Sequence, residues 1–277
     1  YYSSALLNTT RAHKNSAIAL KTKVLLSMQR YADVVTEANK IVSANAPFTA
    51  ATGVAHALQA DITNVFKAPY TTSESILSMP FTANNLPGVQ NALAHYFTPA
   101  SLATPAPGNG EYSLNPNGII ANSAWTDTDK RRTFLFTAPN SKRYLIKFPV
   151  GPTQTDYAPV IRYAEVLLNL AEGLARSTNS VDARAVALLN AVRGRSDASA
   201  VYDAADFADA NELVTAILNE RHIELLGEGF RSFDLLRLGQ TIPAKGPVNA
   251  VTPAQSEYIW PISAQELINN KLCTPNP

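Results

Sequence analysis

Residues 220–239, ERHIELLGEGFRSFDLLRLG, mix acids and arginines with large apolar side chains. A solvated helix face does not need so many leucines and phenylalanines among its charges. The mixture predicts charges held at a packed junction, where the fork of an arginine binds a carboxylate through two hydrogen bonds. Two interpretations are open at this point. The segment is either a catalytic cluster of acids or a structural network of ion pairs that orients two helices.

The spacing of these charges is typical of a helix. Glu220, Glu224 and Glu228 recur every four residues and would form one stripe. Opposite charges three residues apart can meet across one helical turn. We therefore expect each acid to find its arginine within its own segment. The pairs that this spacing offers are Arg221–Glu224, Glu228–Arg231, Arg231–Asp234 and Asp234–Arg237.

Composition excludes several classes of function. The formal net charge is +1, only 16% of residues are charged, and no face rich in lysine or arginine predicts nucleic-acid binding. The single cysteine, Cys273, rules out an internal disulfide and a multi-cysteine metal site, and the four histidines show no ligand spacing. We expect no metal and no cofactor. No apolar run approaches the roughly eighteen residues that would span a bilayer.

Helical periodicity dominates both ends of the chain. Residues 12–45 predict a helical hairpin with a turn at residues 29–30, of the kind found in tetratricopeptide units. We expect its first helix to pack through Ala17, Leu20, Val24 and Met28. Asp209 or Asn211 is expected to cap the third of the later helices, and Ser263 to cap the last. The later helices are predicted at residues 159–177, 181–195, 211–226 and 230–238, with a short one from residue 263.

Residues 48–158 are rich in proline, asparagine and turn signals, and only three short strands are predicted there, at residues 75–81, 132–137 and 144–148. A loop-rich insert of this length is usually functional. Four aromatic residues within it, Tyr96, Phe97, Tyr112 and Trp125, are expected to be exposed. Flat rings suit the C–H faces of sugars, but the same rings would also serve to anchor loops onto helices. We predict one domain over residues 1–277, in which a helical scaffold (1–47 and 159–277) carries this insert as the ligand-binding part.

Several segments, in this order, resemble the SusD/RagB family of outer-membrane nutrient-binding lipoproteins of the Bacteroidetes. The family's elements RYAE, ERxxELxxEGxRxxDLxRxG and WPI are all present. The resemblance covers the helical two-thirds of the chain and, within the insert, extends only to ESILSMPF and DTDKRR. The matching segments are HKNSAIALKTKVLLSMQRYADVVTEANKIV, VIRYAEVLLNLAEGLAR, LLNAVRGRS, residues 220–239 and YIWPISAQELINN.

The resemblance implies a mainly α fold of tetratricopeptide-like hairpins with a loop-rich side that carries the ligand. It implies a binding protein, not an enzyme, on the outer face of the outer membrane. Such proteins capture oligosaccharides, or peptides in RagB-like members, and deliver them to a SusC-like TonB-dependent transporter. The signal peptide and lipidated cysteine of the family are not seen here, and the chain starts at Tyr1. We therefore expect a C-terminal portion or a short member, with a lipid anchor outside this chain.

The resemblance also favours a structural role for the motif charges, because family members with different ligands share them. A glycoside hydrolase needs two acids, one with a raised pKa. Glu165 with Glu172, or Glu224 with Glu228, are the candidate pairs, but nearby arginines are expected to lower their pKa values. A hydrolase and a purely structural subunit that docks on a transporter remain the alternatives to ligand binding. The predicted structural residues are Arg162, Glu165, Glu172, Glu220, Arg221, Glu224, Glu228, Arg231, Asp234 and Arg237.

Overall fold

The computed structural model describes residues 9–88, 92–102, 108–149 and 154–276. The chain separates into two compact units, Tyr1–Phe230 and Arg231–Pro277. The described residues are mainly helical and the strands are few and short, so the predicted mainly α class is confirmed. No helix in these described ranges is long and apolar enough to cross a membrane.

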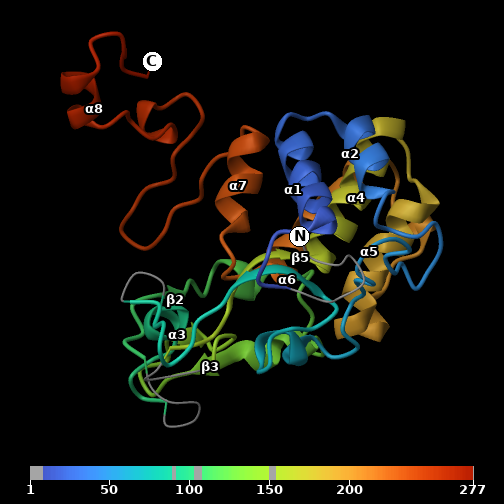
Figure 1. Cartoon of the computed structure of the whole chain (residues 1–277), viewed down its shortest axis with the longest axis horizontal. Coiled ribbons are helices and arrows are strands. Elements are labelled where there is room, and N and C mark those ends of the chain that lie inside the picture. The colour runs from blue at the N-terminus through green and yellow to red at the C-terminus, as the bar shows by residue number, and fades with distance from the viewer. Residues whose placement is uncertain (1–8, 89–91, 103–107, 150–153, 277) are drawn as a thin grey trace. The chain divides into compact units, whose positions relative to one another are not determined.

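The helical part of the first unit is organised around α4 (Tyr163–Thr178), which contacts four other helices (Figure 1). Every residue from Tyr163 to Gly173 is buried, because apolar and small side chains occupy all faces of the helix. Its fully buried leucines form the centre of the main hydrophobic core. The surrounding helices are α1 (Lys14–Ser27), α2 (Tyr31–Ala38), α5 (Ala183–Ser196) and α6 (Ala210–Glu224).

The ends of α6 are set by local sequence. The Asp209 side chain accepts hydrogen bonds from the amides of Asn211 and Glu212, which identifies Asp209 as the cap. The helix ends at Glu224, and Gly227 and Gly229 follow with φ angles of +80° and +84°. Glycine adopts this left-handed conformation at little cost. The chain therefore turns here, and Glu228 lies beyond α6, so it does not share a helical stripe with Glu220 and Glu224.

The segment preceding α4 is a strand, although a helix was predicted from Pro159 onward. β5 (Ala158–Arg162) pairs antiparallel with β1 (Ser75–Met79), and Arg162 lies opposite Ser75. The β-branched residues Val160 and Ile161 suit this pairing, so the helix begins only at Tyr163. The strand places Arg162 at the junction between the sheet and α4.

The insert contains a second sheet of three short strands, β2 (Ser113–Leu114), β4 (Arg143–Leu145) and β3 (Leu135–Thr137), with β4 in the middle. The strands β1, β3 and β4 confirm the three predicted strand regions. The sequence reading missed β2 and the short helix α3 (Leu93–Phe97). In Figure 1, α3, β2 and β3 lie together.

The second unit contains most of α7 (Phe230–Arg237) and the short helix α8 (Ala264–Asn269). Ser263 caps α8 through the amide of Glu266, as predicted. Asp234 and Arg237, three residues apart on α7, form the predicted ion pair at 2.8 Å. Arg231 lies in the first turn of the same helix.

α1 faces the opposite way from its prediction. Leu20, Val24 and Met28 are 52%, 49% and 57% exposed, whereas Leu25 and Leu26 are buried. The helix carries apolar residues on both sides, so periodicity alone could not choose the inward face. Polar contacts contribute to the choice, because Asn169 of α4 donates a 3.1 Å hydrogen bond to Thr22.

Two identical substitutions on α1 distinguish its faces. We expect Leu26→Ala to reduce the free energy of unfolding by about 2–5 kcal/mol, because it removes a fully buried side chain. Leu20→Ala should change it by no more than about 0.5 kcal/mol, since that side chain is half exposed. Both substitutions change the helix propensity by the same amount, so the difference between their free energies of unfolding in chemical denaturation reports the difference in burial. Equal losses would contradict the observed orientation.

Candidate ligand-binding cleft and its ion network

A buried ion network occupies the junction between the helices and the insert of the first unit. It comprises five acids and five cations, so its formal charges cancel, and no side chain in it is more than 5% exposed. Charges removed from water in this way require partners with good geometry. The acids are Glu74, Asp129, Glu220, Glu224 and Glu228, and the cations are Arg131, Lys147, Arg162, Arg193 and Arg195.

Arg162 pairs with three acids of the network. Its Nη1 donates to Glu74 at 2.6 Å and to Glu224 at 2.8 Å, and its Nε donates to Glu228 at 2.8 Å. Glu224 also accepts from Arg195 at 2.6 Å and from Arg131 at 2.9 Å. One guanidinium thus ties β5 to the segment preceding β1, to α6 and to the glycine turn.

The partners of the motif acids come from distant segments, so the expectation of pairs one turn apart is wrong for Glu220, Glu224 and Glu228. Glu220 lies 2.5 Å from Arg131 of the insert and 3.1 Å from Arg193 of α5. The inward face of α6 brings these acids to arginines on the segments packed around it. Arg221 donates to Asn169 of α4 at 2.5 Å.

Sequence reasoning missed six of the ten residues of this network, which are Glu74, Asp129, Arg131, Lys147, Arg193 and Arg195. Arg131 belongs to the DTDKRR segment and Arg193 and Arg195 to LLNAVRGRS, so the resembling segments did contain them. Glu74 is the first residue of the resembling segment ESILSMPF, whereas Lys147 lies outside every resembling segment and is an isolated charge between Ile146 and Phe148. A charged residue among apolar neighbours is a usable sign of a buried ion pair.

The pKa values of the network acids reflect this pairing. Burial alone would raise the pKa of Glu224, but Arg195, Arg162 and Arg131 hold it well below its usual range. Burial opposes the ionised form of Glu228 too, yet Arg162 and Lys147 lower its pKa. The expected lowering is confirmed for this pair of acids.

Glu165 behaves differently, and its expected low pKa is wrong. Burial raises the pKa of Glu165 to about 7, because its nearest cation, Lys23, is 3.9 Å away. Arg162, the anticipated partner, directs its hydrogen bonds to the network instead. Glu172 does meet Arg176 one turn away, at 2.8 Å, as predicted.

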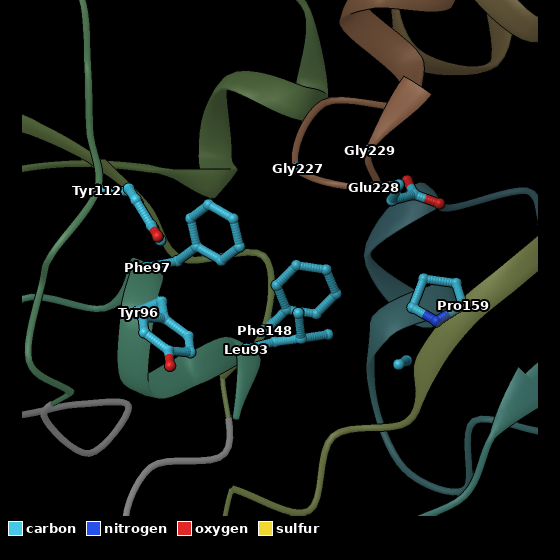
Figure 2. A pocket seen from close by; sticks show the side chains of 10 residues that line it. Leu93, Tyr96, Phe97, Tyr112, Phe148, Pro159, Gly227, Glu228 and Gly229 are labelled. Carbon is cyan, nitrogen blue, oxygen red and sulfur yellow. The ribbon is translucent and has the colours of Figure 1, made fainter. Parts of the chain in front are cut away.

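An open cleft of about 540 Å³ lies beside the network. Figure 2 shows Tyr96, Phe97 and Tyr112 on one side of it, and Pro159 and the glycine turn on the other. We call it the aromatic cleft. Its lining residues are Leu93, Tyr96, Phe97, Tyr112, Phe148, Ala158, Pro159, Gly227, Glu228 and Gly229.

The aromatic wall is a connected set of rings. The centroids of Tyr96 and Tyr112 are 5.7 Å apart, those of Phe97 and Tyr112 5.9 Å, and those of Phe97 and Phe148 6.0 Å. Phe148 meets the edge of Phe66 at 6.0 Å, and the ammonium of Lys147 lies 4.3 Å from the Phe66 ring. The wall is therefore packed against a cation of the network.

Backbone hydrogen bonds hold the loop that carries Tyr112 against α3. The amide of Asn109 donates to the His95 carbonyl at 2.6 Å, and that of Tyr112 donates to the Tyr96 carbonyl at 3.1 Å. A methyl group at Gly108 would lie 2.2 Å from the Ala94 carbonyl, so only glycine fits. The loop presents the Tyr112 ring 57% exposed.

Trp125 does not belong to the cleft, and its expected exposure is wrong. The residue is 2% exposed and packs in a cluster with Ile119 and Ile223. The guanidinium of Arg132 lies 4.9 Å from its ring. Trp125 thus anchors the insert onto α6, which is the alternative role considered for such rings. A ligand role for Tyr96, Phe97 and Tyr112 stays a prediction.

Comparisons with known proteins point to one family. The model of the SusD family matches residues 117–246, and SusD-like protein P38 of Formosa agariphila is 33% identical over 130 residues. A solved SusD superfamily protein from Bacteroides fragilis covers 98% of this chain with 30% identity and a TM-score of 0.79. The chain is similar to the SusD family in sequence over these residues and in fold over nearly its whole length.

The SusD fold therefore extends over nearly all of the chain, although this chain is shorter than its relatives. It spans 58% of the B. fragilis structure, and the match to P38 covers 45% of this chain and 25% of that protein. Surface glycan-binding protein A of Bacteroides thetaiotaomicron, solved with laminarihexaose, has the same fold. Its TM-score is 0.76 at 19% identity, over 97% of this chain and 65% of that one.

The described residues hold no group of three or more histidine, cysteine, aspartate or glutamate side chains that would bind a metal ion. The carboxylates that do gather here are held by arginines and a lysine. The ion network is thus a candidate for structural support, and the aromatic cleft is the candidate site for a ligand.

Breaking the network should be costly. We expect Arg162→Gln to reduce the free energy of unfolding by about 3–5 kcal/mol, because it leaves buried carboxylates without their cation. The matched control is Arg30→Gln, whose exposed pair with Asp33 should contribute less than about 1 kcal/mol. Urea denaturation at neutral pH compares the two variants. A loss below 1 kcal/mol for Arg162→Gln would show that the network does not hold the fold.

Proposed function

We propose that this protein binds an oligosaccharide in the aromatic cleft. The observation that carries the proposal is the wall of three rings, Tyr96, Phe97 and Tyr112, along a cleft of about 540 Å³. Sites for small ligands are commonly concave, mostly apolar and few per protein. The same fold in a protein solved with laminarihexaose supports a glycan as the ligand class.

The chemistry of the wall suits a sugar ring. The C–H groups on one face of a pyranose are weakly positive and match the negative face of an aromatic ring, while the hydroxyls point outward to polar groups and water. Tyr112, which is more than half exposed, offers a face for such contact. The tyrosine hydroxyls and the peptide groups of the glycine turn supply hydrogen-bonding partners for hydroxyls.

The same geometry favours binding over hydrolysis. Among the described residues that line the cleft, Glu228 is the one acid, and it pairs with Lys147 at 2.5 Å and Arg162 at 2.8 Å. Its lowered pKa keeps it ionised, whereas a general acid needs a proton to donate. Glu165 has a raised pKa, but its side chain is 1% exposed and does not line the cleft.

Changing the wall tests the proposal. We expect Tyr112→Ala to weaken oligosaccharide binding about tenfold, which corresponds to about 1.4 kcal/mol, because one stacking face is lost. The control is Trp260→Ala, an aromatic truncation in the second unit. Titration calorimetry against a panel of neutral oligosaccharides measures both, with thermal denaturation as a check on folding. Binding of peptides but of no oligosaccharide would favour a RagB-like role instead.

We further propose that the protein acts on the cell-surface side of the outer membrane and delivers its ligand to a SusC-like TonB-dependent transporter. Similarity to the SusD family supports this location and partner. The outward face of α1 supports a docking role, because Leu20, Val24 and Met28 form an exposed apolar stripe at helical spacing. Exposed apolar patches commonly mark sites of protein contact.

Substitution of the stripe tests the partner. We expect Leu20→Ser with Val24→Ser to abolish capture of a SusC-like TonB-dependent transporter that the unchanged protein captures. Leu86→Ser, which changes an exposed leucine in the insert, is the control and should leave capture unchanged. Co-purification from detergent extracts provides the measurement. Equal capture by all variants would place the docking surface elsewhere.

A further inference from the structure

The charges around the aromatic cleft indicate which sugars it accepts. Resting on the proposed function, we infer that the cleft takes uncharged sugar rings and discriminates against uronate-containing and sulfated glycans. Its lining side chains are aromatic rings, aliphatic groups and a glycine turn, with Glu228 as the one ionised group among the described lining residues. Ring faces carry negative charge density and therefore repel an anionic substituent.

The cations behind the cleft are already neutralised. Lys147 and Arg162 both bond to Glu228, and their side chains are 4% and 1% exposed. A ligand carboxylate or sulfate could reach them only by displacing Glu228 from its partners. That exchange would leave a buried carboxylate without compensation, which is strongly unfavourable.

An exposed acid also adjoins the aromatic wall along the chain. Glu111 directly precedes Tyr112, and its side chain is 42% exposed. It accepts a 2.8 Å hydrogen bond from Asn109 and lies 3.7 Å from Nε2 of His95. An acid beside the most exposed ring of the wall repels an anionic ligand and leaves a neutral one unaffected.

Glu111, Glu228 and the two cations bound to Glu228 are the groups that favour an uncharged sugar in the aromatic cleft.

Matched pairs of glycans test the inference. Suitable pairs are a β-glucan oligosaccharide with its C6-oxidised uronate form, and a sulfated galactan oligosaccharide with its desulfated form. In titration calorimetry at low salt, we expect the neutral member to bind at least about tenfold more tightly, and the difference to shrink as salt screens the repulsion. A charged member that binds as well as or better than its neutral form overturns the inference alone. Failure of every oligosaccharide to bind overturns the proposed function and this inference with it.

A charge reversal tests the edge of the cleft. We expect Glu111→Lys to strengthen binding of the charged member about threefold to tenfold at low salt and to leave the neutral member unchanged. Asp33→Lys gives the same change in net charge on α2 and should have no effect on either member. Equal gains in both variants, or no gain in Glu111→Lys, would show that the acid beside Tyr112 does not select the ligand.

Discussion

The buried ion network is the constraint on which the rest of the first unit depends. Five acids and five cations lie behind side chains that exclude water, so each charge requires its partner in place. The partners come from the segment preceding β1, from β5, α5, α6 and the glycine turn, and from the insert. Because removing any one segment would leave a charge unpaired, the network forces these segments to assemble together.

The network also fixes the position of the cleft. Glu228 pairs with Lys147 and Arg162 on one side and lines the cleft on the other. Lys147 in turn lies over Phe66, which packs on Phe148 at the base of the aromatic wall. The motif that identifies the family thus positions the proposed site without offering its charges to the ligand.

The sequence predicted what local interactions determine. Asp209 and Ser263 cap their helices through amides two or three residues away, and Gly227 ends α6 through its own backbone conformation, so these boundaries could be read directly. Long-range packing decided the features that were missed. The inward face of α1 and the burial of Trp125 depend on segments far away in sequence.

The sequence predicted the rings of the candidate site but not the partners of the buried acids. The sequence singled out three rings of the loop-rich insert, Tyr96, Phe97 and Tyr112. Their assembly into one wall depends on the loop at Gly108 and Asn109, which backbone hydrogen bonds hold against α3. The partners of the acids were not predictable from helical spacing, because an arginine one turn away competes with arginines that the fold brings closer. Glu165 shows the consequence, since Arg162 lies three residues away and directs its hydrogen bonds elsewhere.

The ion network contributes to stability, and the aromatic wall contributes to the proposed ligand surface. The wall residue Tyr112 is exposed and meets the network only through other rings, so replacing it changes the ligand surface and leaves every buried charge compensated. Replacing Arg162 acts on the network instead, because three carboxylates lose a partner, among them Glu228 of the cleft lining. A fold built in this way tolerates changes in the aromatic wall, provided that the insert residues within the network, Glu74, Asp129, Arg131 and Lys147, are kept.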